Sequence, residues 1–183
     1  TISFDIKTLA ALHTLSLSHN HLSSVPSEIG MLQKLRRLFL DGNKLTGLPA
    51  HIVKLEKLEE LRLDRNAFPM FPLEISMLRS LIRLGLSDND IESVPGDIMY
   101  LTKLIELDLD NNKLSSLPDS ISRLAPSLQV LGLAHNHFSE IPQCVHELVN
   151  LDILRLHGNR SAEYEVVDKE TGFVSEGRHI PLR

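Results

Sequence analysis

The sequence has little of several residue types, and each scarcity excludes a class of protein. It contains one cysteine, no tryptophan and only 4% aromatic residues. The lone Cys144 cannot form an internal disulfide, so a cross-linked secreted scaffold is not expected and a reducing compartment is favoured. No apolar run is long enough to span a membrane, and the first residues do not read as a signal peptide, so neither segment is expected.

Basic residues are also few. The chain has 19 lysines and arginines against 24 acidic residues, a net charge of −5, and no run of basic residues stands out. This charge argues against a nucleic-acid surface and against an anionic-membrane anchor. With 42% hydrophobic residues among 183, the chain can still bury a core, and one domain is expected.

Asparagine recurs along the chain at a fixed spacing. The recurrent positions are Asn20, Asn43, Asn66, Asn89, Asn112, Asn136 and Asn159, which are 23 residues apart except for one gap of 24. Each follows a Leu-x-x-Leu-x-Leu frame, as Leu12, Leu15 and Leu17 precede Asn20. In the second half of most units the sequence Pro-x-x-Ile-x-x-Leu recurs. Such self-similarity is typical of a stacked repeat architecture.

The spacing of the apolar residues predicts the structure of one unit. Leu15 and Leu17 are two apart and share one side of an extended segment, so each unit contributes a short strand. Ile29 and Leu32 are three apart and follow a proline, which suits a single tight helical turn. One unit cannot cover its own leucines, but stacked units form a continuous core with parallel strands about 4.8 Å apart.

These motifs resemble the leucine-rich repeat family over residues 2–160. The resemblance implies an α/β solenoid, a right-handed horseshoe with a parallel β-sheet on its concave face and short helical turns or loops on its convex face. The Leu-Pro-x-x-Ile half is similar to the intracellular Ras-group class, which includes Scribble-like scaffolds and Ras-suppressor-like proteins. For that class the resemblance implies a cytoplasmic signalling scaffold or adaptor, without catalysis, that binds a protein partner such as a small GTPase.

The repeat frame divides the chain into three parts. Residues 1–11 form a partial repeat or N-terminal cap, and we favour an array cut from a longer one because nothing in them supplies a polar outer face. Residues 12–160 hold seven strand units. Residues 161–183 form a C-terminal cap or linker, in which β-prone runs at 164–167 and 173–174 indicate a hairpin.

The recurrent asparagines are expected to form a ladder that stabilises the turns. A carboxamide carries both donors and an acceptor, so it can satisfy backbone groups of its own turn and of the adjacent turn. Asn159 also begins an Asn-Arg-Ser glycosylation motif. Because Asn159 occupies a ladder position, we expect it to be buried and unmodified.

No motif indicates catalysis, a cofactor or a metal. The chain lacks the sequences G-x-S-x-G, G-x-x-x-x-G-K-[ST] and H-E-x-x-H, and Cys144 lacks the arginine of a Cys-x5-Arg phosphate loop. Two His-Asn-His motifs, at 19–21 and 135–137, lie five units apart, roughly 24 Å at strand spacing, and cannot share a metal. Cys144 is expected on the outer wall as an ordinary thiol.

The surface that remains is the concave face, where residues before, between and after the paired leucines point away from the core. We predict that a partner protein binds there, through Arg37, Phe39, Asp41, Glu60, Arg62, Asp64, Arg83, Glu106, Asp108, Asp110, Val130, Ile153 and Arg155. Phe39 is an exposed aromatic of the type that serves as a binding hot spot. Val130, Gly132, Ala134 and Ile153 are expected to form a shallow apolar patch.

The charges on this face fall into columns along the repeats. In the first column the side-chain charge alternates in sign from Arg37 to Glu106. This alternation fits a solvated ionic ladder, worth about 0.2–1 kcal/mol per pair, as well as it fits a binding surface. Asp41, Asp64 and Asp110 have no basic residue in their own column. We therefore expect a negative surface that attracts a basic segment of a partner.

Two other functions fit the sequence. The repeats can be the recognition or regulatory part of a larger enzyme, such as a kinase, phosphatase or ubiquitin ligase, whose catalytic part lies outside this chain. A secreted or cell-surface recognition protein would require a leader and usually capping cysteines upstream.

Overall fold

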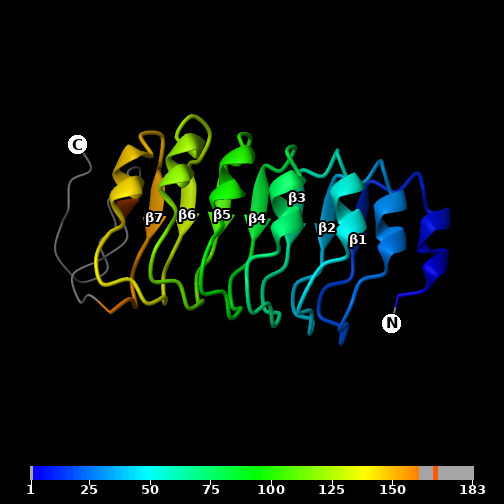
Figure 1. Cartoon of the computed structure of the whole chain (residues 1–183). Helices are drawn as coiled ribbons and strands as arrows, with labels where there is room; N and C mark the ends of the chain where they lie inside the picture. The colour runs from blue at the N-terminus through cyan, green and yellow to red at the C-terminus, as the bar shows by residue number, and fades with distance from the viewer. Residues whose placement is uncertain (1, 161–166, 169–183) are drawn as a thin grey trace.

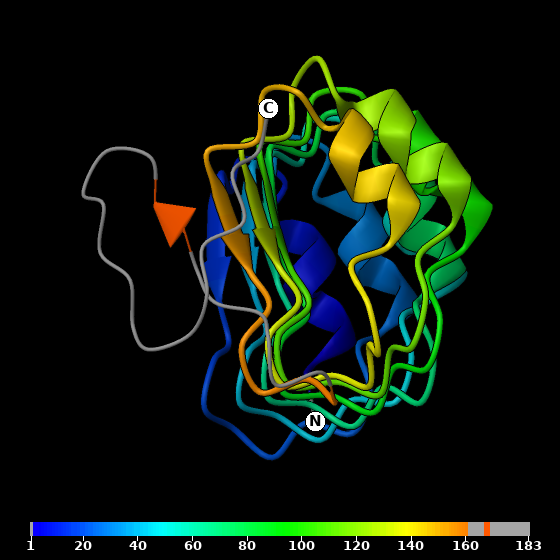
Figure 2. The ribbon, with the colours of Figure 1, turned by 90° about the vertical axis from the view of Figure 1, so that its left-hand side faces the viewer.

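The computed structural model describes residues 2–160 and 167–168. Over these residues the chain winds into successive coils, and most coils pair one short strand with one short helix (Figure 1). Figure 2, turned by 90°, shows the strands along one side of the coils and the helices along the other. The apolar side chains pack between the two layers. This arrangement is the predicted α/β solenoid.

The strands form one open sheet in chain order. They are β1 (Thr14–Ser16), β2 (Arg37–Phe39), β3 (Glu60–Arg62), β4 (Arg83–Gly85), β5 (Glu106–Asp108), β6 (Val130–Gly132), β7 (Ile153–Arg155) and β8 (Val167–Asp168). The first seven pair in parallel, and β8 pairs antiparallel with β7. Leu15 lies opposite Leu38, and Leu38 opposite Leu61, so equivalent leucines of successive repeats stack in register.

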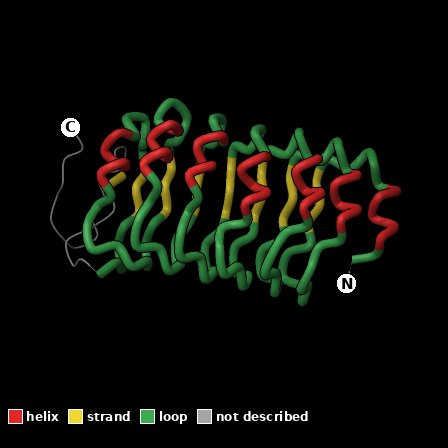
Figure 3. The backbone as a smooth tube through the Cα atoms, in the orientation of Figure 1, coloured by secondary structure: helices red, strands yellow, loops and turns green. Residues whose placement is uncertain are grey.

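The helices are 3₁₀ helices on the convex side (Figure 3). They are η1 (Phe4–Thr8), η2 (Ser27–Met31), η3 (Ala50–Lys54), η4 (Leu73–Met77), η5 (Gly96–Tyr100), η6 (Asp119–Leu124) and η7 (Gln143–Glu147). Proline precedes each of η2 to η7, where its fixed φ favours the start of a turn. In η2 the predicted i, i+3 pair is realised, because Leu32 N donates to the carbonyl of Ile29 at 3.1 Å and both side chains are buried.

The core is complete in the middle of the array and thinner at its N-terminal end. The central leucines of β2 to β6 are fully buried. Leu15 and Leu17 of the first coil pack on the core but are only partly buried, because no described strand lies beyond β1. The N-terminal segment predicted as a partial repeat contains η1, which packs against η2 as the second half of a coil does.

The asparagine ladder is confirmed, and Asn112 shows its geometry. Its Nδ2 donates to the carbonyl of Leu86 in the preceding coil at 2.9 Å and to that of Leu109 in its own coil at 3.2 Å. Its Oδ1 accepts from the backbone N–H of Ile91 at 3.0 Å. One carboxamide therefore satisfies three backbone groups of two coils, as expected from its donors and acceptor.

Burial of the ladder varies along the array. Asn43, Asn112 and Asn136 are buried. Asn20 is exposed and donates only to carbonyls of its own turn, because no strand precedes β1 among the described residues. Asn159 is half-buried rather than fully buried, which corrects the expectation for that position.

The repeat that follows Asn112 is one residue longer than the others. The single 24-residue gap is accommodated by η6, which has six residues instead of five, and by the turn after it, which rises above its neighbours in Figure 1. Of the predicted hairpin over 164–174, only β8 falls within the described residues, and the remainder lies outside them.

Within residues 2–160 and 167–168, no helix has the length and apolar character needed to cross a bilayer.

Candidate functional site

The outward side chains of the sheet form the candidate site, the concave face. In each strand the central leucine enters the core, so the residues on either side of it point away from the core. The register aligns these residues in columns, Arg37 beside Glu60 and Phe39 beside Arg62. All thirteen predicted residues belong to these columns, which extend over β2 to β7 and the positions just after the strands. The structure thus brings them together on one surface.

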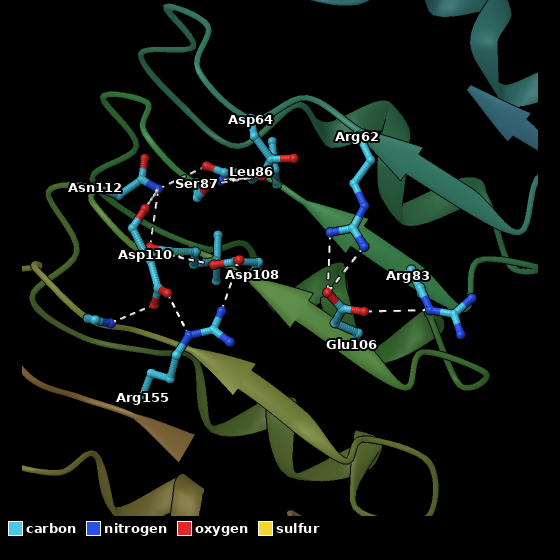
Figure 4. A network of polar contacts seen from close by, with 12 residues as sticks. Arg62, Asp64, Arg83, Leu86, Ser87, Glu106, Asp108, Asp110, Asn112 and Arg155 are labelled. Atoms are coloured by element: carbon cyan, nitrogen blue, oxygen red, sulfur yellow. Dashed lines mark hydrogen bonds and ion pairs between the residues drawn. The ribbon is translucent and has the colours of Figure 1, made fainter. Parts of the chain in front are cut away.

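Arg62 and Glu106 form the centre of a charge network on β3 to β5 (Figure 4). Nη1 and Nη2 of Arg62 both donate to Oε1 of Glu106 at 3.2 Å, although the two residues lie two strands apart. Nε of Arg62 lies 3.3 Å from Oε1 of Glu60 on its own strand. Nε of Arg83 lies 3.5 Å from Oε2 of Glu106. Glu106 therefore binds two arginines.

Arg155 forms a second network that reaches β5 from the opposite direction. Its Nε donates to Oδ2 of Asp110 at 2.6 Å, and its Nη2 lies 2.9 Å from Oδ2 of Asp108 (Figure 4). Asp110 also accepts from the backbone N–H of Ala134 at 2.7 Å. One guanidinium therefore holds two neighbouring carboxylates that would otherwise repel each other.

Two glycines in the sheet leave room for these side chains. A Cβ on Gly132 of β6 would lie 2.7 Å from carboxylate oxygens of both Asp108 and Asp110 and against the guanidinium of Arg155. A Cβ on Gly85 of β4 would lie 2.6 Å from Oδ1 of Asp64. Any side chain at Gly132 would therefore displace the ion pairs that cross β6.

The carboxylates of the third column have partners on this face, but only Asp110 binds an arginine, so the predicted attraction of a basic segment stays a prediction. Asp64 accepts from the backbone N–H of Ser87 at 2.9 Å and from its hydroxyl at 3.0 Å. Asp41 accepts from the hydroxyl of Ser18 at 2.6 Å and lies 3.4 Å from Nε2 of His19. The donors Ser18 and Ser87 occupy the same column as the aspartates, and a comparison of charged residues alone missed them.

Burial and pairing shift the protonation equilibria of this face. Burial raises the pKa of Asp64 and of Asp110, and the negative charge of Asp108 raises both further. Hydrogen bonds to the ionised carboxylates act in the opposite direction but do not cancel these effects. For Arg62, burial acts to lower the pKa, but the carboxylates of Glu106, Asp64 and Glu60 together outweigh it and the pKa is raised. The arginines therefore remain charged, while the two aspartates are harder to ionise than exposed ones.

The predicted ionic ladder of the first column forms only in part. Arg83 contacts Glu106 across adjacent strands as expected. Arg37 instead donates through Nε to the hydroxyl of Thr14 at 3.1 Å, and Glu60 pairs with Arg62 of its own strand. Arg37 thus lies exposed with a neutral partner, beside the half-buried Phe39.

The predicted apolar patch is smaller than expected. Val130 and Ile153 lie opposite each other on β6 and β7 and are both half-buried. Gly132 and Ala134 are buried, because Arg155 lies over the glycine and the alanine packs beneath the surface. Only Val130 and Ile153 therefore contribute apolar surface here.

Among the described residues, neither metal ligands nor a reactive thiol form a site. No three His, Cys, Asp or Glu side chains of the described part of the chain lie close enough together to hold a metal ion. His135 contacts His157 edge-on, with ring centroids 5.0 Å apart, and no third ligand joins them. Cys144 lies in η7 on the convex side, as expected, and its side chain is buried, which raises the pKa of its thiol.

The family model described as leucine rich repeat matches residues 10–68, 79–138 and 102–160. The chain belongs to the leucine-rich repeat family. Members of this family generally act as modules for protein–protein interaction, and the concave sheet described above is the arrangement that the family fold implies.

Solved leucine-rich repeat structures match most of this chain. A leucine-rich repeat protein of Leptospira interrogans is 37% identical with a TM-score of 0.86, over 88% of this chain and 41% of its own. The ectodomain of the Arabidopsis thaliana receptor kinase GASSHO1/SCHENGEN3, solved with CASPARIAN STRIP INTEGRITY FACTOR 2, is 35% identical with a TM-score of 0.77, over 86% of this chain and 20% of its own.

A third structure is that of the plant peptide hormone receptor RGFR1 in complex with RGF2. It is 30% identical with a TM-score of 0.75, over 86% of this chain and 26% of its own. This leucine-rich repeat chain thus spans less than half the length of each of the three. No curated protein sequence matches it.

Proposed function

We propose that this leucine-rich repeat chain is a non-catalytic module that binds a partner protein on its concave face. The observation that carries the proposal is the position of Phe39 on the same strand as the exposed Arg37, next to arginines that already bind carboxylates of this chain. Phenylalanine and arginine are both enriched at the cores of protein interfaces. The receptor structures that bind a protein or peptide are consistent with this use of the fold.

The N-terminal part of the concave face is the part best suited to make new contacts. The arginines of β3 to β7 already bind carboxylates of this chain, so a partner that used them would first have to break those pairs. Among the described residues, Arg37 has only one polar contact, with the hydroxyl of Thr14. It can therefore bind a partner protein without breaking an ion pair of its own chain. We therefore place the centre of the contact at β1 and β2.

We further propose that the module works in the cytoplasm as a signalling scaffold or adaptor, with a signalling protein such as a small GTPase as its partner. The Leu-Pro-x-x-Ile half-repeats and the lone buried Cys144 support this proposal. The competing proposal is a recognition or regulatory domain of a larger enzyme, which is supported by the similarity to the leucine-rich repeat ectodomain of a receptor kinase. The complete open reading frame distinguishes the two.

Affinity capture followed by titration of the purified partner tests the binding surface. Phe39→Ala should weaken binding about tenfold or more, as the loss of a hot spot does. Phe4→Ala, an exposed aromatic on η1 of the convex side, is the matched control and should leave the affinity unchanged. Arg37→Glu should also weaken binding, with the thermal midpoint confirming that each variant is folded. Full binding by both concave-face variants would move the site elsewhere.

A further inference from the structure

A hollow of about 680 Å³ lies at the N-terminal end of the array, away from the concave face. It is lined by the last residues of η2 and η3, Met31 and Lys54, and by the turns that follow these helices, which include Lys34 and Lys57. These turns join the convex helices to the next strand, at the upper edge of the array in Figure 3. The opposite edge carries the asparagine ladder. The hollow is therefore a surface that the proposed concave site does not use.

The lysines of this hollow differ from the arginines of the concave face in their contacts. Lys34, Lys54 and Lys57 are exposed, and within residues 2–160 none of them has an ion pair or a side-chain hydrogen bond. Glu56 is the one acidic residue of the lining. In a chain whose net charge is −5, this small region carries an excess of positive charge. Its cations are available to bind carboxylates without breaking any existing pair.

The hollow also offers apolar surface beside the lysines. Met31 is 53% exposed at its rim, and Ala10 adds a second apolar contact. A thioether adapts its shape to an apolar side chain, and a mixed apolar and cationic lining suits a peptide that carries both carboxylates and an apolar residue.

The chemistry of the lining favours a peptide over other anionic ligands. Polybasic sites for anionic lipids usually contain four to eight lysines or arginines. Nucleic-acid surfaces occur mostly on basic domains, whereas this chain is acidic overall and would repel a long polyanion. A short acidic segment approaches only the lysines and is not subject to that wider repulsion.

We propose that this hollow, the lysine hollow, binds an acidic, extended segment of a partner protein. Its carboxylates would contact Lys34, Lys54 and Lys57, and an apolar side chain would contact Met31. This second contact surface is independent of the concave face, so either proposal can fail without the other.

Fluorescence anisotropy with a synthetic peptide tests the proposal on the intact chain. The probe is a labelled glutamate-rich dodecapeptide with one central leucine. Lys34→Glu combined with Lys57→Glu should weaken its binding about tenfold or more, because two attractive charges become repulsive. Lys44→Glu combined with Lys103→Glu makes the same change of charge at exposed lysines outside the hollow and should change the affinity less than about twofold.

Three results would overturn the proposal. One is no saturable binding of the peptide, and another is equal weakening by the two double variants. The third is tighter binding of phosphatidylserine vesicles or of a single-stranded RNA than of the peptide, with the same dependence on Lys34 and Lys57. A glutamine version of the peptide should bind about tenfold more weakly if carboxylates make the contact. Phe39→Ala should leave peptide binding unchanged, which separates the lysine hollow from the concave face.

Discussion

Arg155 and Asp110 lie 45 positions apart in the sequence, yet Nε of the arginine donates to Oδ2 of the aspartate at 2.6 Å. The contact spans two strands, because Arg155 belongs to β7 and Asp110 follows β5. The strand between them carries Gly132, where no side chain obstructs the arginine. The charged residues of the concave face therefore stabilise the sheet as well as forming the proposed binding surface. Substitutions of these residues should for this reason change stability.

Arg155→Ala should lower the free energy of unfolding by about 1–2 kcal/mol, because it leaves Asp108 and Asp110 adjacent without a cation. Urea denaturation measures the change. Arg83→Ala removes a longer and more exposed pair with Glu106 and should cost about 0.5 kcal/mol or less. Equal effects of the two substitutions would show that Arg155 has no special role.

Gly132→Ala should destabilise the protein by about 1–3 kcal/mol, because the added Cβ would displace Arg155 from its carboxylates. Gly47→Ala is the control, since an added Cβ there meets nothing within 4 Å. Thermal denaturation of both variants gives the comparison. A Gly132→Ala protein as stable as the control would contradict the assigned role of this glycine.

Asn112→Ala should cost about 1–3 kcal/mol, because the backbone N–H of Ile91 loses its acceptor inside the array, while the carbonyls of Leu86 and Leu109 each lose one of their two asparagine donors. Asn20→Ala should cost clearly less, since Asn20 is exposed and bonds only within its own turn. Chemical denaturation of the two alanine variants tests this gradient along the ladder.

Asp64 predicts a pH dependence of stability. Burial raises its pKa in the folded state, so the folded chain holds a proton that the unfolded chain has lost at pH values between the two pKa values. This group therefore contributes stability at low pH that is lost as the pH rises through the folded pKa. Asp64→Asn cannot titrate, and its carboxamide oxygen can still accept from Ser87.

The wild type should accordingly gain stability relative to Asp64→Asn as the pH falls from about 7 to about 4. Urea denaturation of both proteins across this range measures the difference, and subtraction removes the contribution of the other carboxylates. A difference that stays constant with pH would show that the pKa of Asp64 is not raised.

Much of the fold follows from the sequence because one spacing is repeated along the chain. Leu15 and Leu17 predict a strand, Ile29 and Leu32 predict a helical turn, and the structure has both. The ladder role of Asn112 also follows from its position, since a carboxamide is the side chain that can serve two turns. A repeated pattern determines these contacts because each is the same in every coil.

The contacts of the concave face were harder to predict, because long side chains cross between columns. Arg155 was expected to face a partner, and it binds Asp108 and Asp110 of its own chain. The available signal was glycine at an outward strand position, as at Gly132, with an arginine on one side and carboxylates on the other. No pattern in the sequence indicated the lysine hollow, because Lys34 and Lys57 lie in turns outside the leucine frame.

The long contacts of Arg62 and Arg155 affect how easily the array bends. From Asn43 onward each ladder amide binds the coil before its own, whereas Arg62 and Arg155 join coils that are two repeats apart. The stretch from β3 to β7 is therefore cross-linked by ion pairs, while among residues 2–160 β1 and β2 are held only by contacts with neighbouring coils. We expect the array to bend most readily at its first two coils, so that Phe39 and Arg37 can adjust to the shape of what they bind.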